Sequence, residues 1–183
     1  MKKLITMGVA GLALLSLAAC GNTSKRSTSS SSKESVHKVS KPKETAKSSL
    51  YFKNNVLKMR DVKIAITKTK VIPIGQKGNE YGKKPVFAIW FNMTNYTNKK
   101  ISPTDVVLLI KATQETTNST HELEVASLPD DKFLDTQTDT IKKNGTVPNA
   151  VAWEISDSKK PIKLTATTTD SDKEIGHQIY KIE

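Results

Sequence analysis

The stretch from residue 85 to residue 93 is Pro85-Val86-Phe87-Ala88-Ile89-Trp90-Phe91-Asn92-Met93. Side chains in a β-strand point alternately to its two faces. One face of this stretch would carry only large apolar side chains, namely Phe87, Ile89, Phe91 and Met93. The opposite face would carry Val86, Ala88 and Trp90. Because both faces are apolar, the stretch is predicted to be a central strand that is covered on both sides.

Other segments on both sides of this stretch also have strand patterns. Val62, Ile64 and Ile66 alternate with polar residues that include Lys63, which predicts a half-buried strand. Residues 106–110 form a continuous apolar run, which predicts another buried strand. Shorter strands are expected at residues 122–126, 147–155, 162–166 and 176–182.

Turn-forming residues separate these segments. Gly75, Gly78 and Gly82 punctuate one loop, and Asn144-Gly145 is typical of a tight turn because both residues tolerate positive φ. No segment has a sustained helical stripe with caps, and residues 130–140 are expected to hold one short helical turn at most. The sequence therefore predicts an all-β protein, a two-sheet antiparallel β-sandwich of about seven or eight strands over residues 51–183.

The first twenty residues have the composition of an export signal. Two lysines precede an apolar run over residues 4–17, and small residues lead to Ala19 and Cys20, the only cysteine of the chain. This order is typical of a secretory signal peptide, here residues 1–19. The run is shorter than the about 20 residues that a membrane-spanning helix needs.

The cysteine directly after the small residues resembles the lipobox of bacterial lipoproteins. The resemblance implies cleavage between Ala19 and Cys20 and a diacylglyceryl lipid on the sulfur of Cys20. It also implies that the protein is anchored by this lipid to the outer, extracytoplasmic face of the cell membrane. Because Cys20 is the only cysteine, an intramolecular disulfide is impossible.

Residues 20–50 are predicted to be a disordered linker that begins with the lipidated cysteine. They are rich in Ser and Lys and have almost no large apolar side chains. The net charge of the chain is +11, of which residues 21–50 carry seven basic and two acidic side chains, and residues 51–183 carry +4. Export argues against nucleic acid as the partner of this basic chain, so an anionic membrane or wall polymer is expected near the linker. Alternatively, the linker charges only keep that segment extended and soluble.

Two loops hold the candidate site residues. One is a glycine-rich loop whose spacing does not fit a phosphate loop, and it is predicted to be a glycine-rich turn or a recognition loop. Its candidate residues are Gly75, Gly78, Asn79, Glu80, Tyr81 and Gly82. The second loop carries an acidic cluster that matches no calcium loop, so we interpret it as a solvated loop and assign no metal ligand. Its candidate residues are Asp130, Asp131 and Asp135.

No arrangement of catalytic residues is apparent. His37, His121 and His177 are scattered along the sequence, and the chain has no Gly-x-Ser-x-Gly nucleophile elbow. The only thiol is expected to be acylated, which removes Cys/His catalysis. We therefore expect no catalytic residue, no cofactor and no enzymatic activity.

Three segments of the chain resemble a family of uncharacterised lipoprotein domains from Gram-positive bacteria. They are residues 71–92, residues 127–136 and residues 141–155. This family is a domain of unknown function and is similar to the telokin-like group of immunoglobulin-like sandwiches on bacterial surface proteins. The resemblance covers residue 50 to the end and implies the sandwich and the Gram-positive envelope, but it brings no activity and no site residue.

The expected function is that of an extracellular lipoprotein that binds an envelope protein or an anionic wall polymer. The candidate surfaces are the loops at residues 75–84, 95–100 and 127–139, because loops on a rigid scaffold usually carry binding sites. One alternative is a metal-dependent or hydrolytic envelope enzyme that uses residues 130–139. Another is an accessory, chaperone-like lipoprotein for exported proteins.

Overall fold

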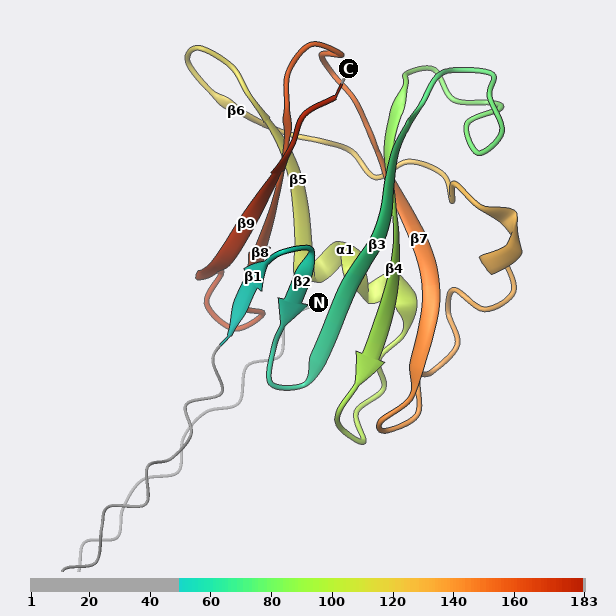
Figure 1. Ribbon diagram of the computed structural model, residues 1–183, viewed down its shortest axis with the longest axis vertical. Helices are drawn as coiled ribbons and strands as arrows, with labels where there is room; N and C mark the ends of the chain where they lie inside the picture. Colours follow the sequence, from blue (N-terminus) through green and yellow to red (C-terminus); the bar gives the residue numbers. More distant parts are fainter. Residues whose placement is uncertain (1–49, 183) are drawn as a thin grey trace, which may run out of the picture. The chain divides into compact units, whose positions relative to one another are not determined.

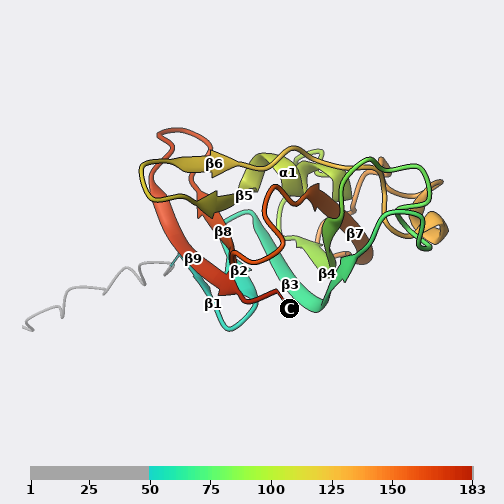
Figure 2. The same cartoon turned by 90° about the horizontal axis from the view of Figure 1, so that it is seen from above.

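The computed structural model describes residues 50–182, which form two antiparallel β-sheets packed face to face (Figure 1, Figure 2). The predicted signal peptide, its cleavage site at Ala19 and Cys20, and the predicted linker up to residue 49 lie outside the described residues. No helix within residues 50–182 has the length and apolar composition needed to cross a membrane.

The first sheet has five strands in the order β1-β2-β3-β4-β7. Their bounds are β1 Tyr51–Lys53, β2 Val56–Lys58, β3 Val62–Ile72, β4 Val86–Asn95 and β7 Thr146–Glu154. The second sheet has four strands in the order β6-β5-β8-β9. Their bounds are β5 Ile110–Glu115, β6 Thr120–Glu122, β8 Ile162–Thr167 and β9 Glu174–Tyr180. The predicted all-β antiparallel sandwich is therefore confirmed, with nine strands in the described residues in place of seven or eight.

Strand β4 is central, as its sequence predicted. It pairs with β3 on one side and β7 on the other. The alternating set Phe87, Ile89, Phe91 and Met93 is buried in the main core between the sheets. The other set contributes Val86 and Ala88, with Trp90 packed against them, to a second and smaller cluster on the outer face of the first sheet.

The apolar run at residues 106–110 was predicted to be a strand, and this prediction is wrong. Residues Pro103–Asp105 form a 3-10 turn that continues into the short helix α1, Val106–Leu109, and only Ile110 begins β5. The carboxylate of Asp105 accepts a hydrogen bond from the backbone N–H of Ser102 at 2.8 Å, and Pro103 occupies the first helical position. The helical turn buries Val106 and Leu109, three residues apart, and leaves Leu108 in solvent.

Two further differences concern short strands. The sequence analysis did not predict the hairpin of β1 and β2, in which Asn54 and Asn55 form the turn with φ values of 51° and 61°. Positive φ at both central residues fits a tight hairpin turn, and asparagine tolerates it. The strand expected at residues 122–126 is also different, because β6 ends at Glu122 and only a bridge from Val125 to Trp153 follows.

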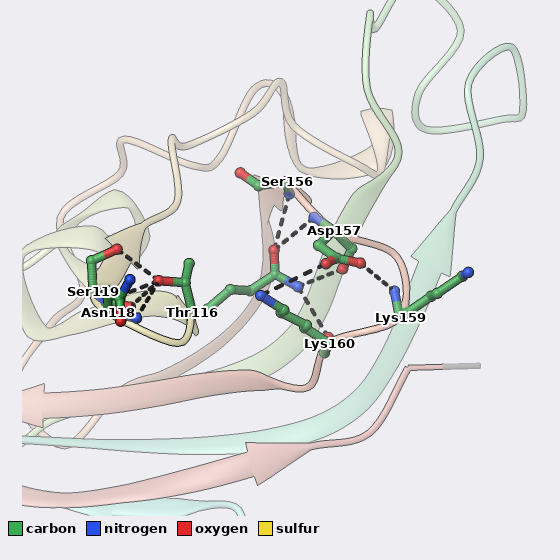
Figure 3. A network of polar contacts seen from close by, with 8 residues as sticks. Thr116, Asn118, Ser119, Ser156, Asp157, Lys159 and Lys160 are labelled. Atoms are coloured by element: carbon green, nitrogen blue, oxygen red, sulfur yellow. Dashed lines mark hydrogen bonds and ion pairs between the residues drawn. The ribbon is translucent and has the colours of Figure 1, made fainter.

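A buried glutamine fixes the connection from β7 to β8. The side-chain amide of Gln114, on β5, donates hydrogen bonds to the carbonyl oxygens of Asp157 at 2.7 Å and Lys160 at 3.0 Å. Its carbonyl oxygen accepts from the backbone N–H groups of Ser156 and Asp157, both at 3.0 Å. Ser156, Asp157 and Lys160 therefore converge on one point from a single turn (Figure 3). All hydrogen-bonding capacity of the buried amide is used.

We predict that Gln114→Leu lowers the free energy of unfolding by about 2–4 kcal/mol, because four backbone groups of the turn lose their partner in a partly buried place. Gln178→Leu is the matched control, since its side chain accepts one exposed hydrogen bond, from the backbone N–H of Asn55. Its effect is expected to stay below about 1 kcal/mol. Urea unfolding of both variants measures the difference, and equal effects would contradict the role given to Gln114.

Candidate functional site: a platform of two loops

The loop between β3 and β4, residues 73–85, is held in one conformation by a buried asparagine. The side-chain amide of Asn79 donates to the carbonyl oxygens of Ile72 at 3.2 Å and Lys84 at 2.9 Å. Its backbone carbonyl accepts from the N–H of Gly75 at 3.0 Å. One side chain thus joins the end of β3, the middle of the loop and the approach to β4. The loop is therefore a rigid extension of the sheet.

The second loop, residues 127–139, leaves the free edge of β7 and lies over the outer face of the first sheet. Just before it, the backbone N–H of Ala126 donates to the carbonyl of Ala152 on β7 at 2.8 Å. The indole N–H of Trp90, on β4, donates to the carboxylate of Asp130 at 2.8 Å. The turn Asp131–Phe133 follows and buries Phe133. Backbone and side-chain hydrogen bonds therefore attach this loop to two different strands.

The charge of Asp130 is stabilised in this position. Burial raises the pKa of its carboxyl, but the hydrogen bond from Trp90 and the ammonium of Lys132, 3.0 Å away, outweigh it. The net pKa shift is downward, so the carboxylate is ionised at neutral pH. It therefore remains an acceptor for Trp90 over the whole physiological range.

The two loops touch at a glycine. Gly78 has a φ of +91°, a conformation that residues with a β-carbon rarely adopt. A β-carbon at this position would also collide with the backbone carbonyl of Pro129 and lie 3.2 Å from a side-chain methyl of Ile72. The loops lie side by side in both views (Figure 1, Figure 2). We call residues 73–85 and 127–139 together the loop platform.

Large apolar side chains of the loop platform face solvent. The exposed fraction is 52% for Ile74, 98% for Tyr81 and 60% for Leu134. Val125, just before the second loop, is also exposed. Single exposed apolar residues are ordinary on a protein surface, but several on two rigid, contacting loops indicate an interaction surface.

The predicted residues of the glycine-rich loop have different roles in the structure. Asn79 is buried and structural, and Glu80 accepts a hydrogen bond from the backbone N–H of Gly78 at 2.9 Å. Gly82 lies against the side chain of Asn79, and Gly75, with a φ of +76°, faces open space. Of the six candidates, Glu80 and Tyr81 have exposed side chains, and Tyr81, 98% exposed, is the large apolar one of the two.

The acidic candidates of the second loop do not form a cluster. Asp130 is bound to Trp90 and Lys132, whereas Asp131 and Asp135 are exposed on the surface. Within residues 50–182, no three His, Cys, Asp or Glu side chains come together as a metal ion would require. The sequence analysis identified both loops but did not single out Ile74 and Leu134. Both loops are mostly polar, so their composition gave no signal for these two apolar side chains.

The third predicted loop, residues 95–100, lies at the other end of β4. Buried Asn95 organises it by donating to the carbonyl oxygens of Lys99 and Ile141, both at 2.9 Å. A groove of about 560 Å³ opens beside it, with Met59, Ile101 and Leu108 among its lining residues. Lys99 at its rim is hydrogen-bonded to Asp61 at 2.5 Å, and this bond is the main cause of the lowered pKa of Asp61. The structure therefore joins two of the three predicted loops and separates the third.

Comparisons with known proteins give a family and a fold. The family model described as "Domain of unknown function (DUF5067)" matches residues 37–168, more than half of the chain. This match confirms the expected resemblance to a domain family of unknown function. The comparison with curated proteins found no match.

Two solved structures share the fold. One is described as "Structure of a putative lipoprotein from Staphylococcus aureus subsp. aureus NCTC 8325", with 21% identity, a TM-score of 0.61, and coverage of 70% of this chain and 89% of that chain. The other, from Enterococcus faecalis, has 23% identity, a TM-score of 0.55, and coverage of 73% of this chain and 93% of that chain. At these identities the likeness is one of fold.

We predict that Gly78→Ala destabilises the protein more than Gly75→Ala. Both variants place a β-carbon at positive φ, which costs about 1–2 kcal/mol. Gly75 has open space around it, whereas Gly78→Ala also forces the two loops apart, at a further cost of about 1–3 kcal/mol. Urea unfolding of the two variants tests this ordering, and equal losses would contradict the contact between the loops.

Proposed function

Because the chain belongs to the DUF5067 family, which has no assigned function, we propose from its own residues that it is a lipid-anchored binding module of the cell envelope. Its anchor is the diacylglyceryl group expected on Cys20, and its partner is another envelope protein, bound at the loop platform. The protein has no catalytic role in this proposal.

The anchoring part rests on the sequence around Cys20. A basic start, a short apolar run and small residues before a single cysteine are the features that a lipidated precursor needs. Each buried methylene contributes about 0.8 kcal/mol to membrane binding, and stable anchoring takes more than one acyl chain. A diacylglyceryl group supplies two chains, so it would hold the domain on the outer face of the membrane.

The binding part rests on one observation, the exposure of Ile74, Tyr81 and Leu134 on loops that are held by hydrogen bonds and by contact with each other. A flexible loop would fold its apolar side chains inward. Here Asn79, Gly78 and Asp130 hold the two loops in place. Rigid presentation lowers the conformational entropy lost on binding, so a preorganised platform favours affinity.

The composition of the platform favours a protein partner. Tyrosine is among the residues enriched in interface hot spots, and a central apolar patch with a polar rim is the usual anatomy of a protein interface. Lys77, Lys83, Asp131 and Asp135 are exposed on the same two loops and supply such a rim. A resident envelope protein and an exported client both satisfy this chemistry, so the chaperone-like alternative differs only in the partner.

The hydrolytic or metal-dependent alternative has no comparable support. The carboxylate of Asp130 is already engaged by Trp90 and Lys132, and the other acidic side chains of its loop stand in solvent. We therefore propose no reaction at this loop.

We predict that a photo-reactive residue at Tyr81 or at Leu134 of the full chain crosslinks to one discrete envelope protein in living cells. Leu108 is the matched control position, since it is 69% exposed and lines the groove beside the separate loop at residues 95–100. Tyr81→Ala combined with Leu134→Ala is expected to weaken binding of that protein about tenfold or more. Crosslinking followed by affinity measurement with the identified protein tests both statements.

Two outcomes would count against the proposal. Equal crosslinking from Leu108 would mean that the contact is not specific to the loop platform. Crosslinking from Leu108 alone would place the interface at the groove.

A Cys20→Ser variant in the same cells tests the anchor, because it is expected to appear in the culture medium or as uncut precursor.

A further inference from the structure

The outer face of the first sheet carries a group of lysines on neighbouring strands. The register places Tyr51, Lys58, Lys63 and Thr94 in one row across β1, β2, β3 and β4. Residues directly opposite one another in a sheet project from the same face. Lys68 lies opposite Trp90, and Lys70 lies opposite Ala88. Ala88, Trp90 and Thr94 are separated by even numbers of residues along β4, so their side chains lie on the same face. All the residues paired with them therefore share the outer face.

We call this the lysine face, and its lysines are Lys53, Lys58, Lys63, Lys68 and Lys70. The strands β1, β2, β3 and β4 contain no Asp or Glu. None of the five lysines makes an ion pair with any described residue. Three acidic side chains next to these strands form ion pairs with other lysines: Asp61 with Lys99, Asp130 with Lys132 and Glu154 with Lys84. The face therefore has an uncompensated positive charge.

The placement of two of these lysines is unfavourable for the folded protein alone. Lys58 and Lys63 are directly opposite on adjacent strands, about 5 Å apart at their β-carbons. Like charges in this arrangement destabilise a sheet. A bound anion between them would remove the repulsion, so the arrangement suits a complex better than the free protein.

Aromatic rings lie beside three of these lysines, and the ammonium of Lys53 is 5.2 Å from the ring centre of Tyr51. The ammonium of Lys58 lies 4.0 Å from the ring centre of Tyr96, and that of Lys68 lies 4.6 Å from the ring of Trp90. The ring of Trp90 is itself held by the hydrogen bond to Asp130. Cation–π contacts restrict the ammonium groups but leave their hydrogen-bond donors free. The charges are thus partly preorganised.

The placement of the lysines along one strand favours a linear polymer as the ligand. The loop at residues 127–139 covers the β4–β7 side of the outer face, where it contacts Trp90. The lysines remain on the β1–β3 side, and Lys63, Lys68 and Lys70 follow β3 over about 20 Å. Three of the lysines are therefore arranged in a line along one strand, beside the strand that the loop contacts.

We propose that the lysine face binds a linear polyanion, which runs along β3 over Lys63, Lys68 and Lys70. The ligand class is a polymer with phosphate or carboxylate groups repeated along its chain, such as an anionic polymer of the cell wall. Lysine acts on such groups as a point charge that does not depend on a fixed bidentate geometry. This site goes beyond the proposed function, since it lies outside the loop platform and takes a different class of partner.

The test measures binding of inorganic polyphosphate to the full chain at several salt concentrations. The triple variant Lys63→Gln/Lys68→Gln/Lys70→Gln is compared with Lys142→Gln/Lys143→Gln/Lys159→Gln, which removes the same charge from exposed residues outside the lysine face. We expect the first variant to bind about tenfold or more weakly, with a shallower salt dependence, and the second to bind within about twofold of the wild type. The linker at residues 20–50 is unchanged in both variants, so its basic residues cannot account for a difference in polyphosphate binding between them.

Two further measurements keep the result interpretable. Lys63→Gln alone is expected to raise the melting temperature slightly, because it removes the repulsion with Lys58. A gain in stability together with a loss of binding excludes misfolding as the cause. Polygalacturonate tests whether repeated carboxylates serve as well as phosphates, and binding of either polymer through the three lysines supports the proposal.

Three results would contradict a polyanion site on β3. Equal weakening in both triple variants would mean that only net charge matters, and it would overturn a site on β3. If vesicles of anionic phospholipid lose binding with the first triple variant while polyphosphate does not, the lysine face is a membrane contact and the proposal is wrong. Unchanged polymer binding in the first triple variant would overturn it as well.

Discussion

Strand β4 needs cover on both of its faces, and the arrangement of the rest of the sandwich follows from that need. Its inner side chains, such as Phe91 and Met93, are buried against the second sheet, as in any two-layer sandwich. Its outer side chains, Val86, Ala88 and Trp90, have no third layer to cover them. The loop at residues 127–139 supplies that cover, and the small side chain of Ala152, opposite Ala88 on β7, leaves room for it. The loop platform is therefore a consequence of burying an apolar strand, which explains why its two loops are rigid.

Local patterns predicted the elements that local physics decides. The alternation around β4 was sufficient because residues 86–91 are apolar on both faces. The first half of β3 was recognised by a different pattern, because Val62, Ile64 and Ile66 alternate with residues that include Lys63. The run at residues 106–110 was mistaken for a strand because five consecutive apolar residues fit a buried strand as well as a helical turn. The signal that separates the two cases stands just before the run, where Ser102, Pro103 and Asp105 form the start of a helix. The hairpin at Asn54 and Asn55 was missed because its strands have only three residues each, which is too short for an alternating pattern to stand out.

The candidate surfaces depend on contacts that no local pattern contains. Composition identified the loops at residues 75–84 and 127–139 separately, but it could not show that Gly78 meets Pro129, which is far away in the sequence. The lysine face was hidden for a different reason. Lys63 and Lys68 are five residues apart, and strict alternation would place them on opposite faces of a strand. The register shift between Ile66 and Lys68 inserts one extra residue, Thr67, and returns Lys68 and Lys70 to the face of Lys63.

The bulge in β3 therefore serves the core and the surface together. Without it, Lys70 would take the half-buried place that Val71 now fills against the core, where an unpaired ammonium is costly to bury. With it, exposed Thr69 and half-buried Val71 take the inner positions, and the side chain of Thr67 donates a hydrogen bond to the backbone carbonyl of Trp90 at 3.1 Å. Packing of Val71 explains the face that Lys70 takes, but it does not explain why the lysines face outward without carboxylates beside them. Exposed lysines cost little in water, and Lys58 gains a cation–π contact with Tyr96. Lys63, directly opposite Lys58, adds a like charge that lowers the stability of the sheet. An anion bound at this pair would offset the repulsion, which is what the proposed site on β3 supplies.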